Sequence, residues 1–345
     1  MKATYINQQG DVDVLTYGEL PEPSAGAGEV LVRVRATALN HLDIFARSGR
    51  NRVVIDRFPH ILGSDIAGEV AEVGPGVQGL GKGERVLMDY SIRCGVCDRC
   101  LAGHDELCTD SRSIGVDIDG GYAQYVSVPA TNVHPIPDSP PFEEAAAIPL
   151  VFKTVWSCLI TRCQLKPGED VLVMAAGSGV GSAAIRLAKI MGARVITTAS
   201  TDEKLAKARA LGADETINYA AEPNYSKKVR ELTDGKGVDL IFDSIGGSVW
   251  DENFECLKQG GRLVNCGVTG GHRASLRIGQ MFTRGLTLMG ASNGSKADFA
   301  DVMKLVRQGQ IRGIISQTFP LEAAAEAHRA MESRNVFGKL VLQIP

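Results

Sequence analysis

Four cysteines lie close together in the first third of the chain, at Cys94, Cys97, Cys100 and Cys108. The spacing C-x2-C-x2-C-x7-C gathers four thiolates, which complete the tetrahedral shell of a structural zinc and leave no open position for a substrate. Free or paired cysteines are the alternative, but three cysteines at successive two-residue gaps favour a metal. An iron–sulfur cluster is disfavoured because the final gap is long and no proline follows Cys108. We therefore predict a zinc lobe over residues 90–110.

A glycine cluster directly follows a short apolar segment at residues 171–176. An apolar, β-branched run, then glycines, then apolar residues three and four apart is typical of a buried parallel strand that turns into a helix. Such a turn allows a close backbone approach, and the helix amides that follow it suit a dinucleotide pyrophosphate. Ser182 stands where a strict G-x-G-x-x-G has its third glycine, so a turn without a ligand is the alternative. The predicted phosphate-binding residues are Gly177, Ser178, Gly179, Val180 and Gly181.

The residues after this turn continue the pattern. Residues 194–199 read as a second strand and residues 202–211 as a second helix, with Gly212 as its C-terminal stop. The two strands and the intervening helix form a βαβ unit of the expected size. Upstream, residues 29–36 and 63–74 alternate as half-buried strands do, which indicates an antiparallel β domain. A helix is expected to start within residues 37–45.

Length and composition exclude several classes of protein. A chain of 345 residues exceeds the usual size of one hydrophobic core, so two domains are expected. The net charge of −3 and the lack of lysine or arginine runs give no reason to expect nucleic acid or an anionic membrane as a partner. We see no signal peptide and no segment long and apolar enough to span a bilayer, so a cytoplasmic protein is expected.

The zinc lobe, the glycine turn and the segment 63–74 together resemble the medium-chain dehydrogenase/reductase superfamily over essentially the whole chain. The resemblance implies an α/β protein in which a GroES-like catalytic β domain, residues 1–150 and 292–345, is interrupted by a Rossmann domain, a doubly wound parallel sheet over residues 151–291. It also predicts helices at 142–147, 151–161 and 322–331 and strands at 238–243, 262–267, 286–290 and 339–344.

By this resemblance, the positions that hold a catalytic zinc in alcohol dehydrogenases are Asn40, the pair Ser64-Asp65, and Leu150. These residues are a poor zinc ligand set, because a catalytic zinc needs three protein ligands and an open position. His41 and Asp65 keep a catalytic metal open as an alternative. The chain therefore resembles the quinone oxidoreductase branch, although it retains the structural zinc lobe that many members of that branch lack.

Without a catalytic metal, conjugated acceptors are the favoured substrates. Zinc stabilises the charge that hydride transfer places on a simple ketone, whereas a quinone or an α,β-unsaturated carbonyl spreads that charge. We predict that Asn40 hydrogen-bonds the substrate or the nicotinamide amide; capping the helix is its alternative. Asp43 is expected to orient other groups beside a basic residue, Lys339. His41 is a candidate proton relay, with packing or solvent contact as the alternative.

The cofactor is predicted to be NADPH, with NADH less favoured. NAD specificity usually comes from an acid at the end of the second strand, where this chain has Ala199 and then Ser200. Ser200, Lys204 and Tyr219 match family positions that contact the NADP phosphate, although Lys204 also fits a solvated helix charge. The resemblance assigns the remaining cofactor contacts to Thr154, Gly179, Val180, Gly267, Val268, Phe337 and Lys339.

The leading hypothesis is an NADPH-dependent reductase of small quinones or enones that works by direct hydride transfer. A zinc-type alcohol dehydrogenase is the enzymatic alternative. A nicotinamide-binding scaffold or sensor with little turnover is the alternative from another class. The resemblance further implies a homodimer or homotetramer formed through the last Rossmann strand.

Overall fold

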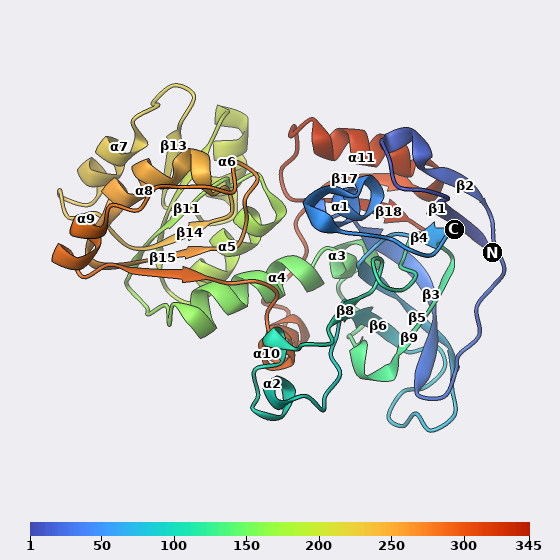
Figure 1. Cartoon of the computed structure of the whole chain (residues 1–345). Coiled ribbons are helices and arrows are strands. Elements are labelled where there is room, and N and C mark those ends of the chain that lie inside the picture. Colours follow the sequence, from blue (N-terminus) through green and yellow to red (C-terminus); the bar gives the residue numbers. More distant parts are fainter. The chain divides into compact units, whose positions relative to one another are not determined.

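The computed structural model describes residues 1–345, and these form two compact units (Figure 1). The first unit comprises residues 1–150 and 295–345, and the second comprises residues 151–294. The chain therefore returns to the first unit at Ser295, three residues after the expected position, with the return falling immediately before helix α10 (Lys296–Arg307).

The first unit is built mainly of antiparallel strands. Its largest sheet has the order β10-β6-β5-β3-β18-β17, and β9 also pairs with β3. The strands are β1 (Lys2–Ile6), β2 (Thr16–Glu19), β3 (Glu29–Ala38), β4 (His60–Ile61), β5 (Asp65–Val73), β6 (Arg85–Met88), β7 (Ser91–Ile92), β8 (Arg112–Ser113), β9 (Tyr125–Pro129), β10 (Val133–Pro135), β17 (Ile315–Pro320) and β18 (Lys339–Gln343). The helices are α1 (His41–Ser48), α2 (Asp98–Leu101), α3 (Phe142–Ala146), α10 and α11 (Ala324–Glu332).

Strand β18 joins the C-terminal end of the chain to the first domain. It pairs antiparallel with β3, with Val341 opposite Ala38, so segments near the two ends of the chain lie side by side (Figure 1). Both strands place apolar side chains in one buried core. Its members include Val30, Val32 and Val34 of β3 and Leu340 and Leu342 of β18. Burial of each such side chain contributes about 1.5 to 3 kcal/mol, which fixes the register of the pair.

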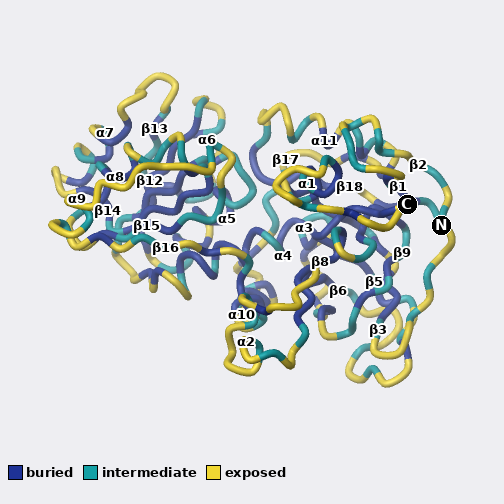
Figure 2. Tube along the Cα trace, viewed as in Figure 1, coloured by how far each residue is buried: buried dark blue, intermediate teal, exposed yellow.

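The second unit is a six-stranded parallel sheet in the order β13-β12-β11-β14-β15-β16. Counted from β11 this is the 3-2-1-4-5-6 order of the Rossmann fold. The strands are β11 (Asp170–Val173), β12 (Arg194–Ala199), β13 (Glu215–Asn218), β14 (Val238–Asp243), β15 (Leu257–Asn265) and β16 (Thr287–Gly290). The helices are α5 (Gly179–Ile190), α6 (Asp202–Ala210), α7 (Tyr225–Leu232), α8 (Trp250–Cys256) and α9 (Ile278–Thr283). The central strands are buried along most of their length (Figure 2).

The structure differs from the sequence expectations at several element ends. The expected helix 151–161 is two pieces, α4 (Pro149–Trp156) and a π-helix (Ser157–Arg162), because Cys163 N bonds back to Cys158 O, five residues earlier. An apolar pattern does not distinguish these two helical periods. The helix sought within residues 37–45 begins only at His41, since Thr37 and Ala38 still pair with β5. Strand β15 begins at Leu257, five residues before the predicted start.

Candidate active site

Three strands bring Asn40, Asp65 and Lys339 together. Asn40 lies two residues beyond the end of β3, Asp65 is the first residue of β5 and Lys339 is the first residue of β18. Ala38 pairs with Asp65 on one side and with Val341 on the other. Sheet pairing therefore places three polar side chains, far apart in the sequence, at one end of the central strands.

The three side chains are buried and hydrogen-bonded to one another. The Lys339 ammonium donates to Oδ1 of Asn40 and, at 2.9 Å, to Oδ2 of Asp65. Asn40 Nδ2 also donates to Asp65 Oδ2, at 2.9 Å, and the Leu150 amide donates to Asp65 Oδ1 at 2.8 Å. Asn40 is 5 % exposed, Asp65 0 % and Lys339 4 %. A buried ion pair is costly unless further hydrogen bonds satisfy it, and here they do.

Asp43 completes this group, which we call the Lys339 cluster: Asn40, Asp43, Asp65 and Lys339. Its Oδ2 accepts from the Asn40 amide at 2.7 Å, and its Oδ1 accepts from the Gly63 amide at 3.2 Å. Complete burial raises the pKa of Asp43 to about 7, against the lowering effects of the Asn40 amide and the Lys339 charge. Lys339 was expected near Asp43; its charge acts on Asp43, while its hydrogen bonds go to Asn40 and Asp65.

His41, the first residue of α1, makes no hydrogen bond to the cluster, and its ring lies 6.3 Å from that of Phe45. Burial first, and the Lys339 charge second, lower the pKa of His41. Asn40 occupies the N-cap position of α1 and forms a capping box with Asp43, and its side-chain oxygen also accepts a hydrogen bond from Lys339. The backbone amide of Asn40 donates to Asp43 Oδ2 in the same capping box. The contact of Asn40 with substrate or nicotinamide stays a prediction.

A catalytic zinc does not fit these residues. Asn40 Oδ1 and Asp65 Oδ2 lie at positions that the resemblance assigns to metal ligands. Both oxygens already accept hydrogen bonds from the Lys339 ammonium group. Leu150 offers no ligand atom, and the Ser64 side chain is a buried hydroxyl. One carboxylate, an amide and a hydroxyl beside a lysine lack the histidine and cysteine ligands that zinc prefers.

The glycine-rich turn connects β11 to α5 as predicted. Ser178 is the N-cap of α5 and its hydroxyl oxygen accepts from the Gly181 amide at 2.9 Å. A Cβ at Gly181 would stand 2.1 Å from the carbonyl oxygen of Ala175, so only glycine fits. The first-turn amides of Gly179 and Val180 have no intrahelical acceptor, and they carry the positive end of the helix dipole. The turn therefore fits a dinucleotide phosphate.

The other predicted cofactor residues of the second unit lie mostly at the carboxyl ends of its strands. Ser200 follows β12, Tyr219 follows β13, and Gly267 and Val268 come shortly after β15. Lys204 is in the first turn of α6, which Thr201 caps through its hydroxyl oxygen. In a doubly wound sheet, ligands bind at this edge. Thr154 lies on α4, and Phe337 and Lys339 belong to the first unit.

Sequence reasoning missed Asp243, the last residue of β14. Its carboxylate is fully buried and accepts from the Ile245 amide at 2.8 Å and from Asn265 Nδ2 at 2.9 Å. Burial raises its pKa. Asn265 also donates to the Gly267 carbonyl at 2.9 Å, so Asp243 holds the loop that carries Gly267. An acid at the carboxyl end of an apolar strand was the available signal.

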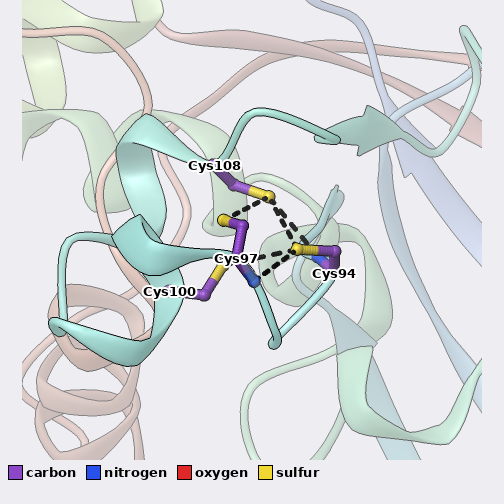
Figure 3. Close-up of side chains that lie close together, drawn as sticks. All are labelled: Cys94, Cys97, Cys100 and Cys108. Carbon is purple, nitrogen blue, oxygen red and sulfur yellow. Dashed lines mark hydrogen bonds between the residues drawn. The ribbon is translucent and has the colours of Figure 1, made fainter.

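The four cysteines of the lobe form one cluster. Their sulfur atoms lie within 4.8 Å of one another, and the side chains point toward a common centre (Figure 3). Backbone amides donate to the sulfurs, from Cys94 to Cys108 Sγ at 3.5 Å and from Cys97 to Cys94 Sγ at 3.4 Å. Such donors stabilise thiolates: an amide hydrogen bond from Cys100 is the main cause that lowers the pKa of Cys97 to about 6. The donor set fits a structural zinc.

The fold and these sites define a two-domain, zinc-binding oxidoreductase that uses a nicotinamide dinucleotide. Comparison with known proteins agrees. Residues 26–138 match the alcohol dehydrogenase GroES-like domain, and residues 179–308 match the zinc-binding dehydrogenase family. The chain belongs to the medium-chain dehydrogenase/reductase superfamily, whose members are NAD(P)-dependent oxidoreductases.

Relatives that are named for different activities match over nearly the whole chain. The NAD-dependent alcohol dehydrogenase of Sulfolobus acidocaldarius is 33% identical, with 100% of both chains covered. The quinone oxidoreductase of Pseudomonas aeruginosa is 34% identical, with 96% of each covered, and the acryloyl-coenzyme A reductase of Sulfurisphaera tokodaii is 30% identical, with 94% of this chain and 95% of the relative covered. A solved structure described as an NAD-dependent alcohol dehydrogenase superposes with a TM-score of 0.96 at 44% identity, with full coverage of both chains. No helix of this chain has the length and apolar character needed to cross a membrane.

Proposed function

We propose that this protein is an NADPH-dependent reductase that transfers hydride to quinones or α,β-unsaturated carbonyl compounds without a catalytic zinc. The observation that carries the proposal is the bonding of the Lys339 ammonium to Asn40 and Asp65. These are two of the positions that the family resemblance assigns to catalytic metal ligands. A cation already supplied by the chain leaves no ligand set for zinc.

The charge requirement of the reaction supports the choice of substrate. The bound nicotinamide supplies the hydride. Reduction of a simple ketone concentrates negative charge on one oxygen, which a metal stabilises by several kcal/mol as a Lewis acid. An enolate or a phenolate shares its charge with carbon atoms, so hydrogen-bond donors suffice. Two of the relatives, a quinone oxidoreductase and an acryloyl-coenzyme A reductase, are named for acceptors of this conjugated type.

NADPH is favoured by the end of β12. Ala199 ends the strand and Ser200 follows it, so no carboxylate stands where an acid would bind the adenosine ribose of NAD. The first acid, Asp202, accepts a hydrogen bond from Asn218 at 2.8 Å. Ser200 and the nearby Lys204 supply a hydroxyl and a positive charge for a 2′-phosphate.

The alcohol dehydrogenase relatives make zinc-dependent alcohol oxidation the second candidate. One experiment separates the two. Purified protein is dialysed against a mild chelator, its zinc content is measured, and cofactor consumption is followed with but-3-en-2-one, 1,4-benzoquinone, butanone and butan-2-ol. We expect about one zinc per chain and reduction of the conjugated acceptors only. Two zincs per chain with oxidation of butan-2-ol would replace this proposal by the second candidate. Cofactor binding without turnover on any of these compounds would indicate a scaffold or sensor.

We also propose a homodimer formed through β16. This strand is the last in its sheet and pairs only with β15, so one edge has no partner in the chain. Unpaired strand edges readily add a further strand. Light scattering on the purified protein measures the number of chains per particle. Leu288→Pro removes an amide from this edge strand, so we expect it to reduce that number.

A further inference from the structure

The hydrogen bonds of the Lys339 cluster leave one N–H group of Lys339 without an acceptor. Both oxygens of Asp65 accept hydrogen bonds, from Leu150, Asn40 and Lys339. Both oxygens of Asp43 accept from backbone amides, and Asn40 Oδ1 accepts from Lys339. Every side-chain oxygen of the cluster is therefore engaged. An ammonium group has three N–H donors. Two of those of Lys339 donate to Asn40 and Asp65.

The cluster thus keeps one charged N–H donor, on Lys339, without a hydrogen-bond acceptor. A ligand that pairs with this donor must bring an atom with a free lone pair. Carbonyl and enolate oxygens are such acceptors, and an enolate oxygen, which carries charge, is bound more strongly by an ammonium group than a neutral carbonyl is. The spare donor is held in a fixed place by two acceptors on two different strands. Such preorganisation is the condition under which a donor stabilises a transition state.

We propose that Lys339 is a catalytic residue whose third N–H donates to the carbonyl oxygen of the acceptor and stabilises the negative charge that develops there. The proposal rests on the reductase function proposed above and assigns to this chain's own ammonium the task of charge stabilisation. Asn40 and Asp65 are positioning residues, since they act by fixing Lys339 Nζ. Lys339 was expected from the family resemblance to contact the cofactor, so the proposal changes its role.

The β-carbon of an enone receives the hydride with its electron pair and forms a new C–H bond. The π pair of the C=C bond moves to form the enolate double bond, and the carbonyl π pair moves onto oxygen, where Lys339 donates. The acceptor is reduced by two electrons and the dihydronicotinamide is oxidised by two. A proton from water then adds to the α-carbon, and the carbonyl forms again.

Burial makes this donor effective. Lys339 is 4 % exposed, and a charge in a low-dielectric site interacts more strongly than one in water. Asp65 carries the opposing charge. Its oxygens accept hydrogen bonds from Leu150 and Asn40 as well as Lys339, so three donors share the negative charge of this carboxylate.

The test compares Lys339→Met, Lys339→Arg and the double variant Asp65→Asn/Lys339→Met. The double variant removes both members of the buried Lys339–Asp65 ion pair, so it leaves no unpaired Asp65 and controls for misfolding. With but-3-en-2-one as acceptor, we expect Lys339→Met and the double variant to lose about 10²- to 10³-fold in kcat, the effect of removing one oxyanion donor. Lys339→Arg should retain a larger part of the activity. The NADPH dissociation constant should stay within about twofold. Lys304→Met, which removes an exposed lysine paired with Asp301, is the matched control.

Two further measurements separate a catalytic role from a structural one. Across enones of increasing enolate basicity, the loss caused by Lys339→Met should grow, because a more localised charge needs the donor more. In Lys339→Ala, added methylammonium should restore part of the kcat. Unchanged kcat with weaker NADPH binding would assign Lys339 to the cofactor and overturn the proposal, as would an equal loss for all acceptors without amine rescue. Failure of the proposed function is seen separately, as the absence of conjugated-acceptor reduction by the unaltered enzyme.

Discussion

Arg47 donates a hydrogen bond from its Nη1 to Nδ1 of His328 over 3.2 Å, and both side chains are buried. Arginine has only donors, so His328 Nδ1 must be the acceptor and the ring proton must be on Nε2. That proton is then donated to the Tyr122 hydroxyl oxygen, 3.1 Å away. The other end of Arg47 pairs with Glu332 at 2.7 Å. The tautomer of His328 is thus fixed by a residue of α1, although His328 lies on α11.

His328 is expected to remain neutral across the physiological range. Burial first, and the Arg47 charge second, lower the pKa of His328 from 6.5 to about 3. Because the unfolded chain binds this proton more readily, stability from this group is present above pH 6.5 and is lost as the pH falls from 6.5 towards 3. Urea unfolding measures the free energy of unfolding at pH 7 and pH 4.5. Its decrease between these pH values should be smaller for His328→Gln than for the unaltered protein. The control is His272→Gln, at an exposed site, whose free energy of unfolding should decrease as much as that of the unaltered protein.

Asp43→Asn should change the pH dependence of stability in the opposite sense. The raised pKa of Asp43 means that the folded chain holds this proton more tightly than the unfolded chain, so the stability from this group is full below pH 3.8 and is lost as the pH rises to about 7. The variant also leaves one of two backbone amides without an acceptor, at a cost of about 1 to 3 kcal/mol. Unfolding experiments should therefore show a larger destabilisation at pH 4.5 than at pH 8. A difference that is the same at both pH values would contradict the burial of a protonated Asp43. Asp138→Asn, at an exposed site, is the control.

Gly181→Ala should weaken cofactor binding. The added Cβ would stand 2.1 Å from the Ala175 carbonyl oxygen, so the turn before α5 must shift and its amides must move with it. We expect the NADPH dissociation constant, measured by fluorescence titration, to rise about tenfold or more, which corresponds to about 1.4 kcal/mol. Gly279→Ala is the control, because a Cβ at Gly279 meets no atom within 4 Å. Equal affinities for the two variants would show that the turn does not hold the phosphates.

Ser200→Asp should shift the cofactor preference towards NADH. A carboxylate after β12 repels a 2′-phosphate and accepts from a free ribose hydroxyl. We expect the ratio of kcat/KM for NADPH to that for NADH to fall by about tenfold or more. Ser333→Asp adds the same charge at an exposed position of the first unit and should leave the ratio unchanged. An unchanged ratio for Ser200→Asp would place the adenosine ribose elsewhere.

Cys108→Ser should release the structural zinc. Its thiol is the most buried of the four and has sulfur partners at Cys94 and Cys97. Structural zinc contributes directly to folding free energy. A loss of only about 2 kcal/mol would lower Tm by roughly 4 to 8 °C for a unit of this size. Zinc analysis and thermal unfolding measure both effects, and Cys266→Ser, outside the lobe, should keep its zinc. Full zinc content in Cys108→Ser would contradict a four-thiolate site.

Much of the fold could be predicted because its signals are local. Strands β12 and β14 have the predicted ends, since both are apolar runs bounded by turns or helix starts. The fold class and superfamily are confirmed. The π-helix after α4 could not be predicted, because its hydrogen-bond offset leaves little trace in the apolar pattern. The zinc donor set was visible because its four ligands lie on one short segment.

The Lys339 cluster was predicted only in its parts. Asn40 and Asp43 were chosen from a local motif, and Asp65 was considered only as a metal ligand. The bonding of Asn40 and Asp65 to Lys339 depends on the pairing of β18 with β3, between residues separated by about three hundred positions. Asp43's raised pKa likewise depends on burial by segments from several parts of the chain, which no short pattern reports.

The sequence by itself determined the zinc-binding thiolates, the phosphate-binding turn and the alternation that builds each sheet, because these depend on neighbouring residues and on backbone geometry. Only the tertiary structure decided which side chains meet at the ends of β3, β5 and β18, and how many N–H groups of Lys339 find acceptors there. Hydrogen-bond satisfaction and burial are properties of packed surroundings, and those surroundings are assembled from segments that lie far apart along the chain.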